Sequence, residues 1–148
     1  MLWLAAIVAL IIVIGAWGYK TQQKEDEAFA RAFEKAVLEY SSRIAQHDIV
    51  VIAPEAEGYR PVRGEIVFAI IPNVKNHDTQ ADGKLIITSK AIVFETPSRS
   101  ERLTYTSLSN VEAKRDGIEL RKRKGPRRAF RLSNPNLLGL MVAAFNQS

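Results

Sequence analysis

The chain opens with a long apolar run. Residues 1–19 contain no charged or strongly polar side chain. As a helix they would extend roughly 27–28 Å, close to the hydrocarbon thickness of a bilayer, about 30 Å. Trp3 lies near one end of the run, Trp17 and Tyr19 lie at the other, and Lys20 follows, as aromatic and basic residues do at membrane interfaces. The pattern predicts a transmembrane anchor over Met1 to Tyr19. A cleaved signal peptide would need a basic start, a shorter run and small residues before the cut.

Basic residues follow the apolar run and do not precede it. They are Lys20, Lys24, Arg31 and Lys35. Because Lys and Arg are in excess on the cytoplasmic side of membrane segments, the sequence predicts a single-pass protein. Its N-terminus would lie outside and its C-terminal domain in the cytoplasm.

Residues 22–44 carry apolar side chains at helical spacing, which predicts an amphipathic juxtamembrane helix within residues 20–46. No Gly or Pro lies between Tyr19 and Pro54, so this helix can continue the anchor, with Gly15 and Gly18 as weak points. The apolar stripe either packs on the domain that follows or forms a dimer seam or partner groove. We favour the first, because five positions are too few for a sustained heptad repeat. The stripe comprises Phe29, Phe33, Val37, Tyr40 and Ile44.

From about Gly64 the apolar period changes to two, which is typical of strands. Turn residues separate the strands, and the longest predicted turn is 73–83. Strands joined by such short loops are antiparallel and form a sandwich or barrel. The first strand has apolar residues in both phases, so we expect both of its faces to be covered. The seven predicted strands contain Ile66, Phe68 and Ile70; Leu85 and Ile87; Ile92 and Phe94; Leu103 and Tyr105; Val111 and Ala113; Ile118 and Leu120; and Phe130 and Leu132.

A second amphipathic helix ends the chain. Ser133 or Asn134 can cap it, and Pro135 suits its first position. Its broad apolar face is too short to span a membrane and is predicted to close one end of the barrel. The segment 47–63 is a predicted linker, in which the apolar run 49–53 forms either an edge strand or part of the linker. The helix face comprises Leu137, Leu138, Met141, Val142 and Phe145.

Composition excludes several classes of site. The chain has no Cys and two His, which excludes disulfides, thiolate zinc sites, iron–sulfur clusters and a cysteine nucleophile. No Gly-rich phosphate loop, H-E-x-x-H or G-x-S-x-G motif occurs, so we expect no catalysis, no metal and no cofactor. His77, Asp78 and Asp82 favour a polar loop tip over a weak metal site, because their spacing defines no ligand geometry.

Positive charge is concentrated near the end of the predicted barrel. The chain has a net charge of +5, but residues 111–131 alone carry +6 and the remainder −1. Gly125-Pro126 is a predicted turn with cations on both sides. This basic hairpin contains Arg121, Lys122, Arg123, Lys124, Arg127 and Arg128, with Arg131 just beyond.

Seven antiparallel strands followed by one helix resemble the pleckstrin-homology-like (PH-like) fold. The local motifs resemble those of the GRAM and bacterial PH-like families, over residues 64–146. Ala91 departs from that pattern, since the families often have a basic residue there. The resemblance implies that the loops after strands one, three and six surround one open end, which would bring Lys75, Arg99 and Arg102 near the basic hairpin. The motifs are GEIV at 64–67, GKLIIT at 83–88, AIVF at 91–94, LTYTSLSNV at 103–111, GIEL at 117–120 and RAFRL at 128–132.

These features predict a mainly β domain over residues 64–148, tethered to a membrane, for which the resemblance suggests a bacterial inner membrane. The first functional hypothesis is a non-catalytic module that binds acidic lipid headgroups through the basic hairpin, since each cation near an anionic leaflet contributes about 1 kcal/mol. The alternative is a protein-interaction or assembly subunit of a membrane complex, or a homo-oligomer, with the juxtamembrane helix or the barrel as docking surface. The hairpin would then be solvated surface. Nucleic acid is a weaker candidate, because no aromatic residue lies among the cations to stack a base.

Overall fold

Two helices flank seven strands in the computed structural model, which describes the backbone of residues 2–46, 59 and 61–148 and the side chains from residue 17 onward within those ranges. This order confirms the prediction of seven strands followed by a C-terminal helix. The elements are α1 (Leu2–Ala45), β1 (Val67–Asn76), β2 (Asp82–Thr88), β3 (Ala91–Glu95), β4 (Ser100–Thr104), the 3-10 turn η1 (Tyr105–Ser107), β5 (Leu108–Lys114), β6 (Gly117–Lys122), β7 (Arg128–Arg131) and α2 (Pro135–Asn146).

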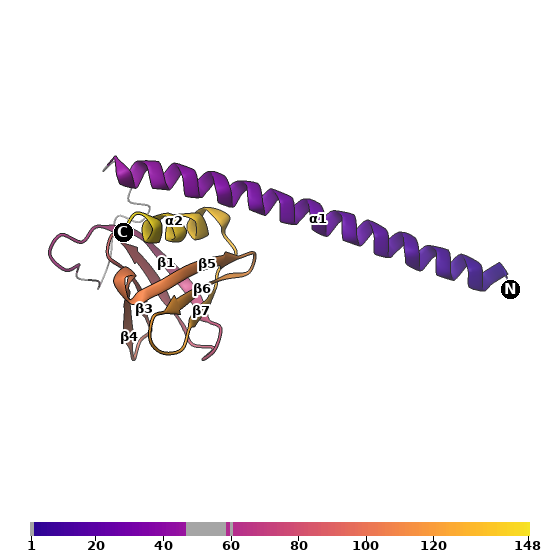
Figure 1. Cartoon of the computed structure of the whole chain (residues 1–148). Coiled ribbons are helices and arrows are strands. Elements are labelled where there is room, and N and C mark those ends of the chain that lie inside the picture. The colour runs from indigo at the N-terminus through magenta and orange to yellow at the C-terminus, as the bar shows by residue number, and fades with distance from the viewer. Residues whose placement is uncertain (1, 47–58, 60) are drawn as a thin grey trace.

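Helix α1 is continuous through Gly15 and Gly18, the two positions at which a break was conceivable. Its 44 residues extend about 66 Å, and its N-terminal half projects beyond the rest of the molecule (Figure 1). Most of the predicted anchor, residues 1–16, lies outside the described side chains. Within the part of the chain that is described, no helical segment combines the length and hydropathy needed to cross a bilayer.

The strands form one antiparallel sheet in the order β4-β3-β2-β1-β7-β6-β5, which is strongly curled (Figure 1). Consecutive strands are joined by short hairpin turns, except that η1 lies between β4 and β5. Tyr105, predicted to continue the fourth strand, begins that turn instead. Its hydroxyl donates to the backbone oxygen of Thr88 (2.7 Å), so the buried ring leaves no unpaired polar atom.

The predicted turn at 73–83 is wrong in its extent, because β1 continues to Asn76. The pairing of β1 with β2 shifts register between Ile71 and Val74, and Asn73 has a positive φ of 57°. This geometry is a β-bulge, which inserts an extra residue and bends the strand. Beyond it, Val74 and Asn76 are buried again. The polar residues at the bulge concealed the second half of the strand.

Helix α2 covers the end of the sheet opposite the loops that follow β1, β3 and β6 (Figure 1). The side chain of Asn134 caps it by accepting from the backbone N–H groups of Asn136 and Leu137 (2.9 and 3.3 Å), which satisfies two donors that the helix leaves free. Leu138 and Met141 are fully buried in the core. The predicted cap and the predicted closing role are both confirmed.

The apolar stripe of α1 packs against this domain. Phe29, Phe33, Tyr40 and Ile44 contact the main core, and Ala36 is buried against Gly139 of α2, where an added Cβ would come within 2.5 Å of the Ala36 Cβ. This confirms the prediction that the stripe packs on the domain that follows, which we favoured over a dimer seam.

Ion pairs join α1 to the barrel at a second place. Arg115, in the turn between β5 and β6, donates to Asp26 and to Glu25 (2.7 Å to Glu25). The second half of α1 is therefore held both by its apolar face and by a charged contact nearer the predicted anchor.

A small second cluster covers the outer face of β1 to β3. Ile86, Ala91 and Val93 are buried there, with Tyr59 and Val67 packed against them. The prediction that both faces of the first strand are covered is confirmed in part, because Val67 and Ile70 are partly buried by this cluster, whereas Ile66 is 43% exposed. The apolar run 49–53, whose role the sequence left open, lies outside the described residues.

Candidate functional site

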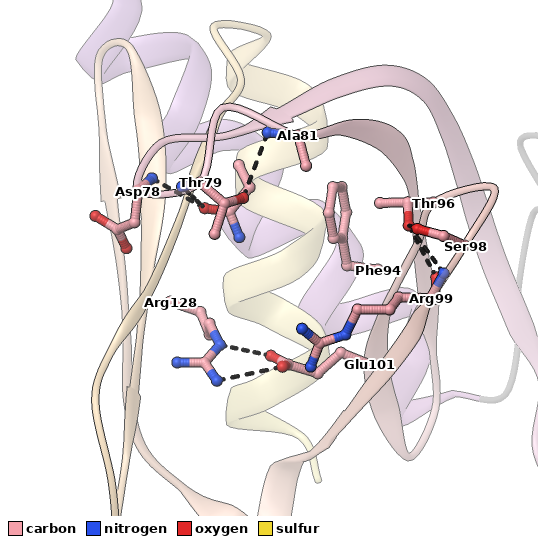
Figure 2. Close-up of a pocket in the computed structure, with 10 residues that line it drawn as sticks. Asp78, Thr79, Ala81, Phe94, Thr96, Ser98, Arg99, Glu101 and Arg128 are labelled. Atoms are coloured by element: carbon pink, nitrogen blue, oxygen red, sulfur yellow. Dashed lines mark hydrogen bonds and ion pairs between the residues drawn. The ribbon is translucent and has the colours of Figure 1, made fainter.

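Three segments meet at the open end of the barrel, away from α2. They are the turn after β1, the turn after β3 and the first residue of β7, and together they line a pocket of about 370 Å³. Figure 2 shows these segments around the pocket. The resemblance implied that the loops after strands one, three and six surround this end; of the residues expected there, Arg99 and Arg128 line the pocket, whereas Lys75 and Arg102 do not.

Local hydrogen bonds hold both turns. The side-chain oxygen of Asn76 accepts from the backbone N–H groups of Asp78 and Thr79 (2.9 and 3.1 Å). In the other turn the Thr96 hydroxyl accepts from the N–H of Arg99 (3.0 Å), while the Thr96 N–H donates to the Arg99 carbonyl (2.8 Å). Because side chains replace water as backbone partners, the rim of the pocket is preorganised.

An ion pair crosses the mouth of the barrel. Nε and Nη2 of Arg128 donate to the two carboxylate oxygens of Glu101 (2.7 and 3.3 Å). Both side chains are about three-quarters buried, and the Arg99 guanidinium lies on the other side of the same carboxylate (Figure 2). The lining also includes Asp78, so its charged residues are two arginines and two carboxylates. The pocket is therefore close to neutral.

A buried carboxylate organises the outer side of the basic hairpin. Glu119 is 5% exposed and accepts from Lys114 (3.2 Å), Arg121 (3.2 Å) and Arg127 (2.7 Å). The hydrogen bond from Lys114 is the strongest cause holding the pKa of Glu119 below its usual range, and the two arginines add to it. Arg121 also faces Glu112 (3.6 Å), so much of the local positive charge is compensated.

The prediction of one basic cluster is therefore wrong in its geometry. Arg99 and Arg128 share the open-end pocket, whereas Arg121 and Arg127 surround Glu119. Arg123 donates through Nε to the Thr106 carbonyl (3.1 Å). Because consecutive residues of an extended segment alternate between its two faces, Arg127 reaches Glu119 while Arg128 points into the open-end pocket.

The remaining predicted site residues are spread further. Lys75 lies beside Arg131 on paired strands and within 3.8 Å of Asp82. Lys122 and Lys124 flank the turn at Gly125 and make no ion pair among the residues that the structure describes.

Arg102 lies outside the open-end site altogether, in a network with Glu65. It donates to both oxygens of that carboxylate (3.2 and 2.6 Å), and Thr88 donates to it as well (2.8 Å). Burial alone would raise the pKa of Glu65, but the hydrogen bonds from Arg102, Tyr59 and Thr88 outweigh it and lower the pKa to about 2. Burial and the bond to Glu65 raise the pKa of Tyr59 to about 12. This network fastens the segment before β1 to the sheet.

The acidic residues that pair with these cations were not predicted from the sequence. One signal was available, because Glu119 and Arg121 are two apart on one strand and share a face. The others required strand register: Glu112 lies opposite Glu119 across β5 and β6, and Glu101 reaches Arg128 from the far edge of the sheet. In the described part of the chain, no three His, Asp or Glu side chains are grouped as metal ligands.

The seven-stranded antiparallel sheet and the C-terminal helix have the PH-like fold. Among solved structures, the chain is similar to the Vps36 N-terminal PH domain, with a TM-score of 0.51 and 15% sequence identity, over 62% of this chain and 87% of that one. At this identity the likeness concerns the fold. No family model matches the sequence, and the search of curated proteins found no relative.

Proposed function

We propose that the chain is a non-catalytic, membrane-anchored PH-like module that presents the open end of its barrel to a protein partner. The observation that carries this proposal is the docking of α1, which joins the predicted anchor to the barrel without a break. A PH-like domain is a binding module for lipids or proteins, and the orientation that α1 imposes favours a protein.

The orientation follows from the direction of α1. If residues 1–19 cross the bilayer, residues 20–45 extend about 39 Å beyond it at 1.5 Å per residue. The turn that contains Arg115, bonded to Glu25 and Asp26, is then the part of the barrel nearest the bilayer. The open end faces away from α1 (Figure 1), along the membrane plane and not toward it.

The charge of the open end supports the same conclusion. Glu101 compensates Arg128, and the lining also includes one further acid, Asp78, and one further base, Arg99. A neutral pocket with fixed charges of both signs complements a polar protein surface better than it complements a polyanionic headgroup.

A second candidate, binding of acidic lipids, has one observation in its favour. Lys122 and Lys124 flank the hairpin turn without an ion pair among the described residues. These cations would reach an anionic leaflet only if the chain bent between the anchor and the barrel. The finer assignment to the GRAM or bacterial PH-like families, and the cytoplasmic location of the barrel in a bacterial inner membrane, are also proposals.

Depth measurements separate the two candidates. Because the chain has no Cys, single cysteines at Asp116 and at Pro126 can carry a fluorophore in the full-length protein, reconstituted in nanodiscs with acidic lipids. Nitroxide on the lipid headgroups should quench the label at Asp116 more strongly than the label at Pro126. Equal quenching at both sites that disappears in high salt would overturn the proposed orientation and support lipid binding.

Photocrosslinking in native membranes then tests for the partner. A benzophenone side chain at Ser98, on the rim of the pocket, should form a discrete adduct with another protein. The matched control is Leu38, which is 73% exposed on α1 and should form none. Adducts with lipid alone at Ser98 would contradict the proposal. A reporter fused after Ser148 should be active only if it is one that functions in the cytoplasm.

A further inference from the structure

We propose that the opposite end of the barrel carries a second docking site, which takes an acidic peptide segment of a protein partner. The site is the cleft between η1 and the C-terminal end of α2, of about 700 Å³. We name it the distal cleft. It shares no residue with the open-end pocket.

The distal cleft has an apolar wall. Tyr105 and Leu108 are buried beneath it, and the half-buried ring of Phe145 meets Tyr105 edge to face, with ring centroids 6.2 Å apart. Since Phe145 is on the last turn of α2 and Tyr105 is on η1, side chains from two elements form one surface. This wall suits an apolar side chain of a ligand.

Two uncompensated cations stand at the rim. Nζ of Lys90 donates to the Arg63 carbonyl (3.0 Å), and Nε of Arg123 donates to the Thr106 carbonyl (3.1 Å). Neither makes an ion pair with a carboxylate among the described residues. Arg102, the third cation of the lining, is neutralised by Glu65. No Asp or Glu side chain lines the cleft, and the two uncompensated cations outnumber the carboxylate of Ser148, so the charge of the cleft complements acidic groups.

The position of the distal cleft selects a peptide over a bilayer. Helix α2 runs beside α1 in the same direction, and its C-terminal end lies next to the C-terminal part of α1 (Figure 1). Given the proposed anchoring, on which this step rests, the cleft is on the side of the barrel farthest from the membrane. A free phosphate would use the cations but not the apolar wall, whereas an acidic peptide with apolar side chains uses both.

Peptide binding to the full-length protein in neutral detergent tests the inference without a bilayer. The probe is a fluorescent Glu-Glu-Phe-Glu-Leu-Glu hexapeptide, followed by anisotropy at physiological salt. We expect saturable binding, and about tenfold or greater weakening in Lys90→Gln/Arg123→Gln, since an exposed ion pair accounts for up to about fivefold in affinity. The matched control, Lys122→Gln/Lys124→Gln, removes two hairpin cations and should bind as the wild type does.

Three results would overturn the inference: no binding of the hexapeptide, equal weakening by the control variant, or equal binding of a hexapeptide in which Gln replaces every Glu. Competition by inorganic phosphate as strong as that by unlabelled hexapeptide would also overturn it, because the apolar wall would then contribute nothing. The open-end crosslink at Ser98 does not involve Lys90 or Arg123. Failure of the Ser98 crosslink would therefore refute the proposed function without deciding whether the hexapeptide binds to the distal cleft.

Discussion

The contact between α1 and α2 makes a sharp prediction at Gly139. A Cβ at this position would lie 2.5 Å from the Ala36 Cβ and 3.1 Å from the Val37 backbone nitrogen. Ordinary carbon contacts are about 3.5–4.0 Å, so Gly139→Val forces the two helices apart. The chain cannot relieve this overlap by rotating a side chain, because the nearest atoms are a methyl group and main chain.

The magnitude follows from two opposing terms. Val is slightly better than Gly inside a helix, by a few tenths of a kcal/mol. Extra carbons in a packed core usually cost 1–3 kcal/mol, and here the overlap includes backbone. We expect Gly139→Val to lower the free energy of unfolding by about 2–3 kcal/mol.

The matched control is Gly18→Val, since nothing lies within 4 Å of an added Cβ there. Urea denaturation of the full-length protein in neutral detergent, followed by circular dichroism, measures both variants. Ala36→Gly in the Gly139→Val background should restore part of the loss, with a coupling above about 0.5 kcal/mol. If Gly139→Val and Gly18→Val are both within about 0.5 kcal/mol of wild type, α1 is not docked on α2 and the orientation argument fails.

Two further predictions concern the barrel. Phe130 is 2% exposed, and its ring centroid lies 4.9 Å from that of Phe94. Phe130→Ala should therefore lower the free energy of unfolding by about 3–5 kcal/mol. A loss below about 1 kcal/mol in urea denaturation would mean that the strand phase is misassigned. The hydrogen bonds to Glu65 lower the pKa of its carboxyl from 4.5 to about 2. The ionised carboxylate therefore stabilises the fold fully above pH 4.5, and this stabilisation is lost as the pH falls toward 2. The stability difference between wild type and Glu65→Gln should therefore shrink over that range, and a difference that does not vary with pH would contradict the assigned network.

Most of the fold could be predicted from periodicity because each element is locally consistent. The strands are short apolar or alternating runs bounded by turn residues, Asn134 and Pro135 mark the start of α2, and the stripe from Phe29 to Ile44 is helical. The error in β1 arose where a bulge interrupts the alternation, since a positive φ at Asn73 leaves no mark in the hydrophobic pattern.

The site was less predictable because it depends on pairing across strands. A run of cations in sequence indicates a positive surface only if no carboxylate faces it. Glu101 and Glu119 do face it, from positions 27 and 2 residues away from Arg128 and Arg121. Such partners become visible only once the curl of the sheet and the register are known. The distal cleft was not predicted for the same reason, since Lys90 and Arg123, 33 residues apart in sequence, line one cleft only in the folded chain.

An unbroken α1 also works as a lever. If residues 1–19 span a bilayer, any tilt of that segment is passed to the barrel, because no loop lies between them to absorb it. At about 39 Å from the membrane, a tilt of 10° displaces the far end of the helix sideways by about 7 Å. Hydrophobic segments tilt when the bilayer thins and straighten when it thickens. The sideways position of the open end would thus depend on the thickness of the membrane. That position would determine which neighbouring proteins in the membrane the open end can contact.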